Sequence, residues 1–252
     1  MSFARSLAYL VAYSARRQFR SKKMLLSSIL LALLAGIVLL VGFQEPWKTK
    51  AFGEYIVLGV LGAFFLPMVT LLFGTGALGD DWEEKSLVYL LTRPIPRWCI
   101  FSCKFLAAAP WALATTVGAL FLLERIAFLQ AHESFISLFG FCFRAILLGT
   151  LAYTALFTLL GAVFRHSTLI AIGYVFIIEV FLGSVPGILK RLSIRFHVWS
   201  MIYDGGPLHP EKEMFFLPVS GETASWVLTS VAVGCVIIGA FLFSRREYRD
   251  TI

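Results

Sequence analysis

Six long apolar runs dominate this sequence and constrain its fold more than any other feature. They cover about 24–43, 55–78, 98–123, 138–164, 168–189 and 223–243, and each contains few charged residues. A helix of about 20 apolar residues crosses the hydrocarbon core of a bilayer and satisfies its own backbone polar groups. We therefore predict an all-α integral membrane protein, with six transmembrane helices in a single transmembrane domain over residues 1–252.

Composition and charge agree with this prediction. The chain is 59% hydrophobic and 15% charged, and its formal net charge is +7. A positive balance in a membrane protein reflects basic residues that gather in cytoplasmic loops. With the N-terminus inside, 14 of the 22 Lys and Arg residues lie on the cytoplasmic side. We therefore expect both termini in the cytoplasm, and we expect no nucleic-acid partner.

Two segments outside the apolar runs have a recognisable character. Residues 3–20 carry Phe3, Leu7, Leu10 and Val11 at helical spacing, which predicts an amphipathic helix in the cytoplasmic headgroup layer. No cleavage signal follows it, so we expect this segment to be kept. Residues 190–222 form the longest polar stretch, and we expect an extracytoplasmic segment there, with a possible periplasmic or surface partner.

The cysteines do not predict a metal centre. Cys99, Cys103, Cys142 and Cys235 all fall inside or at the ends of the predicted spans, and no histidine stands near the first two. A disulfide framework is typical of small secreted domains rather than of such positions. We expect these residues to be ordinary small apolar side chains, with no metal site.

The stretch GDDWEEKSLVYLLTRPIPRW, residues 79–98, lies between the second and third spans, on the cytoplasmic side. With Gly79 ending the second span, Asp80 and Glu83 have the spacing of a capping box, and Pro94 stops a helix. We predict a short helix over 80–92. It is either a solvated loop helix or a rigid docking element for a soluble partner. The residues assigned to such docking are Asp80, Asp81, Trp82, Glu83, Glu84, Leu87, Leu90, Leu91, Arg93, Pro94 and Arg97.

The run DWEEKSLVYLLTRPIPR at 81–97, followed by Lys104-Phe105-Leu106-Ala107, resembles the first cytoplasmic loop of ABC-2 type permeases. Ser86 stands where this family more often has glycine, and Ile95-Pro96 where it more often has Val-Ser. The basic amphipathic start, six spans and basic tail are similar as well. The chain looks most like the small permeases that mature nitrous-oxide reductase.

The resemblance implies a transporter subunit, usually of an exporter, in the bacterial plasma (inner) membrane. It implies two copies of an ABC ATPase subunit as partners, a second permease chain in a homodimer, and surrounding membrane lipid. The helix after the second span would couple ATPase closure to the spans. The sequence contains no Gly-x-x-x-x-Gly-Lys-Ser/Thr motif, so we expect no cofactor in this chain, with ATP bound by the partner subunit.

Two ionisable residues fall within apolar runs, Arg144 in the fourth and Glu179 in the fifth. A charge at the bilayer centre costs about 2.5–3.5 kcal/mol on insertion scales, so such residues are candidates for function. Arg144 and Glu179 could form an intramembrane pair or line a transport path. A glutamate held by a structural hydrogen bond is the other interpretation.

Two other functions compete with transport. Glu83-Glu84 is similar to the start of the Glu-Glu-x-x-x-Arg motif of intramembrane proteases, but Val88 stands where the arginine belongs. The four histidines also lie at loop positions, which argues against that enzyme. A non-transporting membrane scaffold or signalling partner of an ATPase is the second alternative. We expect no enzymatic activity in this chain itself.

Overall fold

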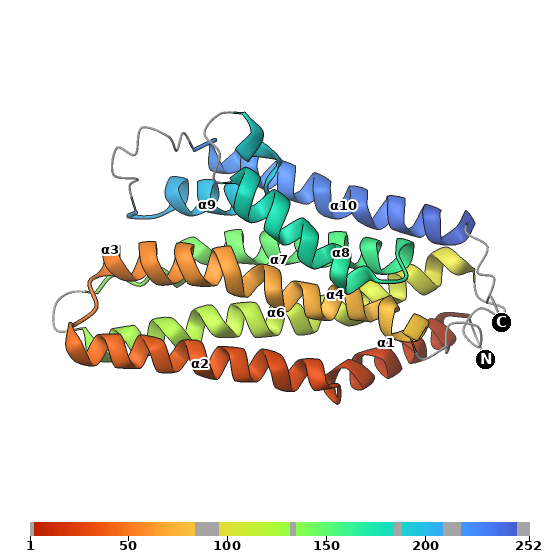
Figure 1. Cartoon of the computed structure of the whole chain (residues 1–252), viewed down its shortest axis with the longest axis horizontal. Helices are drawn as coiled ribbons and strands as arrows, with labels where there is room; N and C mark the ends of the chain where they lie inside the picture. The colour runs from red at the N-terminus through yellow and green to blue at the C-terminus, as the bar shows by residue number, and fades with distance from the viewer. Residues whose placement is uncertain (1–2, 84–95, 132–134, 184–187, 209–217, 246–252) are drawn as a thin grey trace.

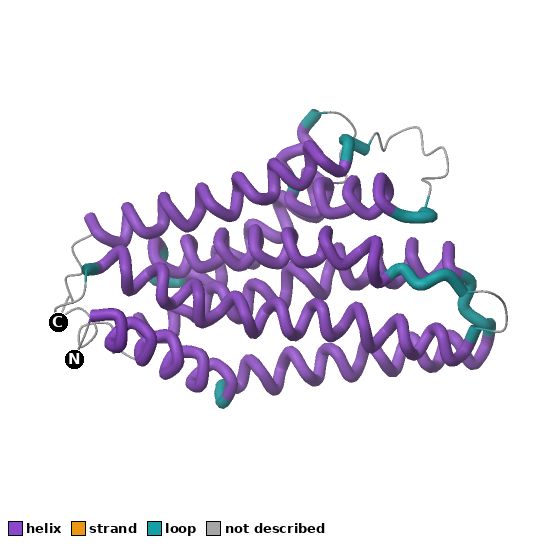
Figure 2. Tube along the Cα trace, turned by 180° about the vertical axis from the view of Figure 1, so that it is seen from behind, coloured by secondary structure: helices purple, strands orange, loops and turns teal. Residues whose placement is uncertain are grey.

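The computed structural model describes residues 3–83, 96–131, 135–183, 188–208 and 218–245. In these ranges the structure is helical without β-strands, and the helices form one elongated bundle (Figure 1, Figure 2). The all-α prediction is therefore confirmed. The first half contains α1 (Phe3–Phe19), α2 (Lys22–Gln44), α3 (Thr49–Ala51), η1 (Phe52–Phe65) and α4 (Leu66–Glu83). The second half contains α6 (Arg97–Gln130), α7 (Phe139–Val163), α8 (Ser167–Tyr174), η2 (Val175–Leu182), η3 (Leu189–Leu192), α9 (Ile194–Gly205) and α10 (Gly221–Arg245).

Five helices in the described part of the chain are long and apolar enough to cross a membrane. They are Lys22–Gln44, Thr49–Trp82, Arg97–Gln130, Phe139–Val163 and Gly221–Arg245. The second consists of α3, η1 and α4 in continuous succession. The second and third contain 34 residues each, or about 51 Å of helix, against a hydrocarbon core of about 30 Å. These two helices therefore extend well past the predicted spans at 55–78 and 98–123.

The fifth predicted span, 168–189, differs most from the structure. Its helix, α8 with η2, covers only Ser167–Leu182. It ends directly before the sequence Gly-Ser-Val-Pro-Gly at 183–187, whose proline and glycines disfavour a helix. The chain continues through the short η3 into α9, which packs against α7 and α10. In Figure 1, α8 and η2 run along the bundle and α9 lies nearer its opposite end.

The segment 190–222, expected to be extracytoplasmic and polar, is therefore partly built into the bundle. Most residues of α9 are buried, among them Phe196, Val198 and Ile202. Residues 209–217 of this segment lie outside the described residues. A helix with so much apolar surface is buried against its neighbours because exposure of that surface to water is unfavourable.

Close packing of α4 against α7 forms the centre of the bundle. A Cβ atom added at Gly74 would lie 2.7 Å from the Cβ atom of Phe157, and one added at Gly161 would lie 3.0 Å from the carbonyl oxygen of Thr75. Small residues allow two membrane helices to approach in this way. The two glycines therefore determine how tightly α4 and α7 pack.

The start of α1 and the end of α10 lie at the same end of the bundle (Figure 1). From this end α1 runs back along the bundle and meets α2 at an elbow formed by Arg20 and Ser21, and α1 packs against α6. The indole nitrogen of Trp111 donates a hydrogen bond to the carbonyl oxygen of Ala15 at 3.0 Å. The Trp111 ring also lies 5.0 Å from that of Phe19, measured between centroids. The amphipathic segment is thus fixed to the bundle.

Candidate functional site

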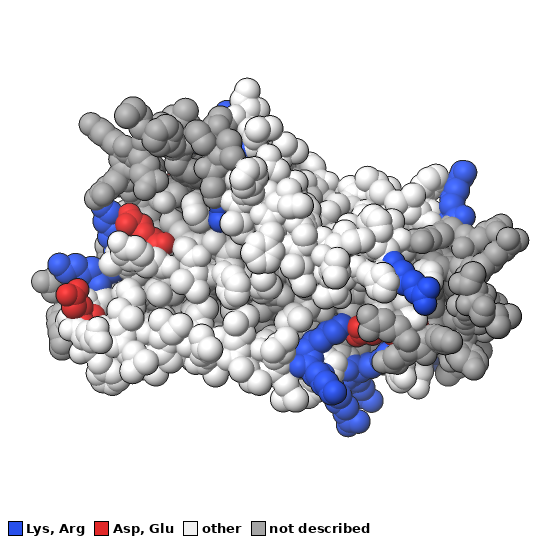
Figure 3. All heavy atoms as spheres, viewed as in Figure 1, with Lys and Arg blue, Asp and Glu red and all other residues white. Residues whose placement is uncertain are grey.

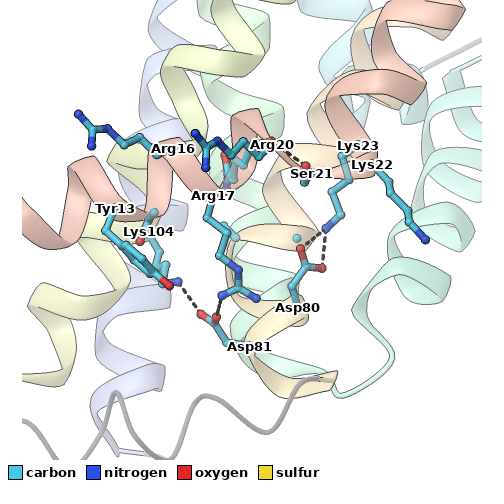
Figure 4. Close-up of a pocket in the computed structure, with 14 residues that line it drawn as sticks. Tyr13, Arg16, Arg17, Arg20, Ser21, Lys22, Lys23, Asp80, Asp81 and Lys104 are labelled. Carbon is cyan, nitrogen blue, oxygen red and sulfur yellow. Dashed lines mark hydrogen bonds and ion pairs between the residues drawn. The ribbon is translucent and has the colours of Figure 1, made fainter.

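A cluster of ion pairs joins α1, α2 and α6 to the end of α4. Lys23 Nζ lies 2.5 Å from Asp80 Oδ1 and donates to both carboxylate oxygens of Asp80. Asp81 is shared by two cations, with Arg17 Nη1 2.6 Å from Oδ1 and Lys104 Nζ 2.6 Å from Oδ2. Figure 4 shows these three bridges side by side. We call these five residues the ionic cluster.

The three cations of the ionic cluster come from three different helices. Arg17 lies on the last turn of α1 and Lys23 on the first turn of α2, so the elbow between the two helices directs both toward α4. Lys104 comes from the first third of α6. The cluster therefore holds the elbow, the end of the second long helix and the start of the third in one arrangement.

The two acidic residues differ in burial. The Asp81 side chain is 4% exposed and that of Lys104 is 7% exposed, whereas Asp80 and Lys23 are 34% and 24% exposed. Removal of one partner from a buried pair leaves the other charge uncompensated, which is costly. Exposed pairs contribute little, with typical values of about 0–1 kcal/mol. Asp81 is thus the residue on which this arrangement most depends.

The capping role predicted for Asp80 is wrong. Helix α4 does not end at Gly79 but runs on to Glu83, so Asp80 lies in the last turn of a helix rather than before its first. Carboxylates at the negative end of a helix dipole are unfavourable by themselves. Basic residues of α1, α2 and α6 compensate for this. Lys104 pairs with Asp81 inside the bundle.

The other predicted docking residues are only partly described. Trp82 is half-buried and packs beside a small apolar group that includes Phe101 and Phe243. Arg97 begins α6 and is exposed. Most of the predicted helix over 80–92 lies outside the described residues, and so do Glu84, Leu87, Leu90, Leu91, Arg93 and Pro94. Glu83 is the last residue of α4.

Glu179 and Arg144 are not brought together by the structure. Glu179 is fully buried and accepts hydrogen bonds from the backbone N–H groups of Ile194 and Arg195, both at 3.0 Å. It also accepts from the hydroxyl of Ser193 at 2.6 Å. Arg144 instead donates to Ser225 Oγ at 3.5 Å.

The role of Glu179 follows from where α9 begins. The first N–H groups of a helix have no partner within the helix, and their partial positive charge favours an anion. The Glu179 carboxylate fills this position from η2, and the hydroxyl of Tyr174 donates to it at 3.1 Å. Of the two interpretations of the sequence, the hydrogen-bonded structural glutamate describes this geometry. Glu179 therefore ties η2 to the start of α9.

A second buried glutamate, Glu124 in α6, was missed by sequence reasoning. It is 1% exposed, and its Oε1 accepts from the backbone N–H of Leu138 at 3.1 Å, directly before α7. The predicted third span ended at Leu123, which placed Glu124 in a loop. A signal was present in the sequence, since apolar residues continue at helical spacing through Ala127 and Phe128.

An open pocket of about 740 Å³ lies beside the ionic cluster, lined by the elbow of α1 and α2, the end of α4, and Lys104. Figure 3 shows Lys and Arg gathered on the surface at this place. The arrangement of long apolar helices, with a charged elbow where α1 meets α2, is that of a multi-pass membrane protein.

Comparison with known families defines the protein further. Residues 8–201 match the model of the ABC-2 family transporter proteins, so the chain belongs to this family. The match runs from α1 into α9 and includes the ionic cluster and Glu179. The chain is accordingly an ABC transporter permease, a membrane component of a transporter. No curated protein matches this chain.

Proposed function

We propose that this permease is the membrane subunit of an exporter and works with a separate ABC ATPase that docks on the segment between α4 and α6. The ionic cluster is the observation that carries this proposal. That segment leaves α4 two residues after Asp81, so a force on the segment acts first on the end of α4. Through Asp81 the same force reaches α1 and α6. One soluble partner could thus move three membrane elements together.

We infer the orientation of the protein in the membrane from the distribution of its basic residues. Basic residues of cytoplasmic segments outnumber those of outer segments by 14 to 8, and such a bias determines topology. This orientation places the start of α1 and the end of α10 on the cytoplasmic side. The elbow and the ionic cluster then lie toward the same side. We place the chain in a bacterial inner membrane as one of two permease chains, each with its own ATPase subunit. The subgroup that matures nitrous-oxide reductase stays a prediction.

Co-purification with a cognate ATPase, followed by reconstitution in vesicles, tests the proposal. The permease should retain the ATPase through gentle extraction, and substrate movement should depend on ATP hydrolysis. The double variant Leu87→Asp and Leu90→Asp should insert normally but lose the ATPase, because charge would replace the apolar side of the predicted docking helix. The outer substitution Lys48→Asp is the control and should retain it.

The same experiment also distinguishes a transporter subunit from a non-transporting scaffold of an ATPase. ATPase binding with no ATP-dependent movement of any candidate substrate would favour the non-transporting scaffold. Purification of the permease without an ATPase, under conditions that preserve other membrane complexes, would contradict both.

A further inference from the structure

The pocket beside the ionic cluster has a large excess of positive charge. Six cations and two carboxylates line it, which leaves an excess of four positive charges. Three of the cations belong to the ionic cluster. Among the described residues, Arg16, Arg20 and Lys22 have no ion-pair partner, and all three are exposed. In Figure 4 these three point away from the two carboxylates. They are therefore free to bind an anion from outside the chain.

Within the described part of the chain, two buried polar atoms in the pocket wall also lack a hydrogen-bond partner. Ser14 and Gln18 are 4% and 8% exposed, and both line the pocket. Ser14 Oγ and Gln18 Oε1 have no hydrogen-bond partner among the described residues. Buried polar groups without partners are costly and uncommon. An oxygen-rich ligand in the pocket would satisfy the Ser14 hydroxyl, which can donate.

The surroundings of the pocket show which kind of anion fits. The charged elbow lies where the apolar run of α2 begins, which is the level of lipid phosphates in a bilayer. Next to it, Leu25, Leu26 and Ile29 of α2 expose apolar surface, and so do the aromatic residues Tyr13 and Phe19 of α1. A ligand with a phosphate at this level and acyl chains beside it would meet cations at one end and apolar side chains along its length.

We propose that this pocket binds the headgroup of an anionic phospholipid from the cytoplasmic leaflet. Arg16, Arg20 and Lys22 bind the phosphate, and the acyl chains lie against the start of α2. Clusters of basic residues on an interfacial helix recognise anionic lipids in this way. The inference is independent of the ATPase and of transport, because lipid binding is measured on the permease alone. A lipid at this place would stabilise the elbow that the ionic cluster attaches to α4.

The test uses the full chain, delipidated in detergent and mixed with equal amounts of phosphatidylglycerol and phosphatidylcholine of the same acyl chains. Retained lipid is counted by native mass spectrometry. Phosphatidylglycerol should be retained in preference. The triple variant Arg16→Gln, Arg20→Gln, Lys22→Gln should lose that preference, with affinity falling roughly fivefold for each cation removed. Ser14→Ala should weaken retention without any change of charge.

The control variant Lys48→Gln, Arg125→Gln removes two exposed cations from the other end of the bundle and should retain phosphatidylglycerol as the unchanged protein does. Circular dichroism and thermal unfolding verify that all variants fold. Equal retention of the two lipids by the unchanged protein would overturn the proposal. So would full displacement of the lipid by inorganic phosphate, which would identify a site for free phosphate. A triple variant that binds lipid normally but loses the ATPase would identify the pocket as a protein-docking surface.

Discussion

Asp81 is the residue with the greatest structural consequence in this protein. It is almost fully buried at the end of α4 and is held by Arg17 and Lys104 from two other helices. Asp80, its neighbour, makes a more exposed bridge to Lys23. Two adjacent residues of the same type therefore have unequal energetic roles, and the difference arises from burial.

Asp81→Asn should lower stability by about 3–5 kcal/mol, because the nearly buried Lys104 loses its counter-charge. Asp80→Asn, the matched control, should cost less than about 1 kcal/mol. Thermal unfolding in detergent measures both. The double variant Asp81→Asn, Lys104→Gln should recover part of the loss. Equal effects of the two single variants would contradict the assigned difference.

Glu179 is the second residue whose role depends on the tertiary structure. Glu179→Gln replaces one acceptor oxygen by an NH₂ group, which would face N–H or O–H donors at the start of α9. We expect the free energy of unfolding to fall by about 1–3 kcal/mol. A cysteine placed at Ser200, a buried position on α9, should also become more reactive in this variant. Arg144→Gln should leave that reactivity unchanged. Energetic coupling between the two substitutions in a double-mutant cycle would show that Arg144 and Glu179 interact after all.

At the scale of elements, the contact of α4 with α7 depends on glycine. Gly74→Ala should lower the unfolding temperature, because its new Cβ would lie 2.7 Å from that of Phe157. Overpacking costs about 1–3 kcal/mol, more than the roughly 1 kcal/mol by which alanine favours a helix.

Gly118→Ala in α6 is the matched control, since a Cβ there would meet nothing within 4 Å. It should leave the unfolding temperature unchanged or raise it slightly. Size-exclusion chromatography after heating, on protein in detergent, compares the two variants. A Gly74→Ala protein as stable as the Gly118→Ala protein would show that α4 and α7 can separate at no cost.

At the scale of the whole molecule, the proposed orientation places the ionic cluster inside the cell. A membrane-impermeant maleimide should label Lys48→Cys in intact cells, and Arg20→Cys only after the membrane is opened. Both positions are exposed, whereas Cys99, Cys103 and Cys142 are buried and should react slowly. The opposite pattern of labelling would reverse the orientation and place the proposed ATPase contact on the wrong side.

The apolar runs, the amphipathic start and the loop motif of 81–97 were sufficient to predict an all-α ABC-2 permease. These features are local, because the length and composition of one segment decide whether it can cross a bilayer. The ends of the helices were predicted less well. Helix α4 continues through Gly79 because ion pairs from α1, α2 and α6 stabilise its acidic last turn, and no local pattern reveals those partners.

The sequence by itself determined that this chain is a helical membrane protein and which family it resembles. It predicted six crossings, whereas five helices in the described residues are long and apolar enough to span a membrane. Only the tertiary structure decided which charges meet. It paired Asp81 with Arg17 and Lys104 from positions 64 and 23 residues away, and it directed Glu179 to the start of α9 rather than to Arg144. The physical reason is that bilayer insertion depends on the sum of local transfer free energies. The partner of a buried charge depends instead on which helices pack together.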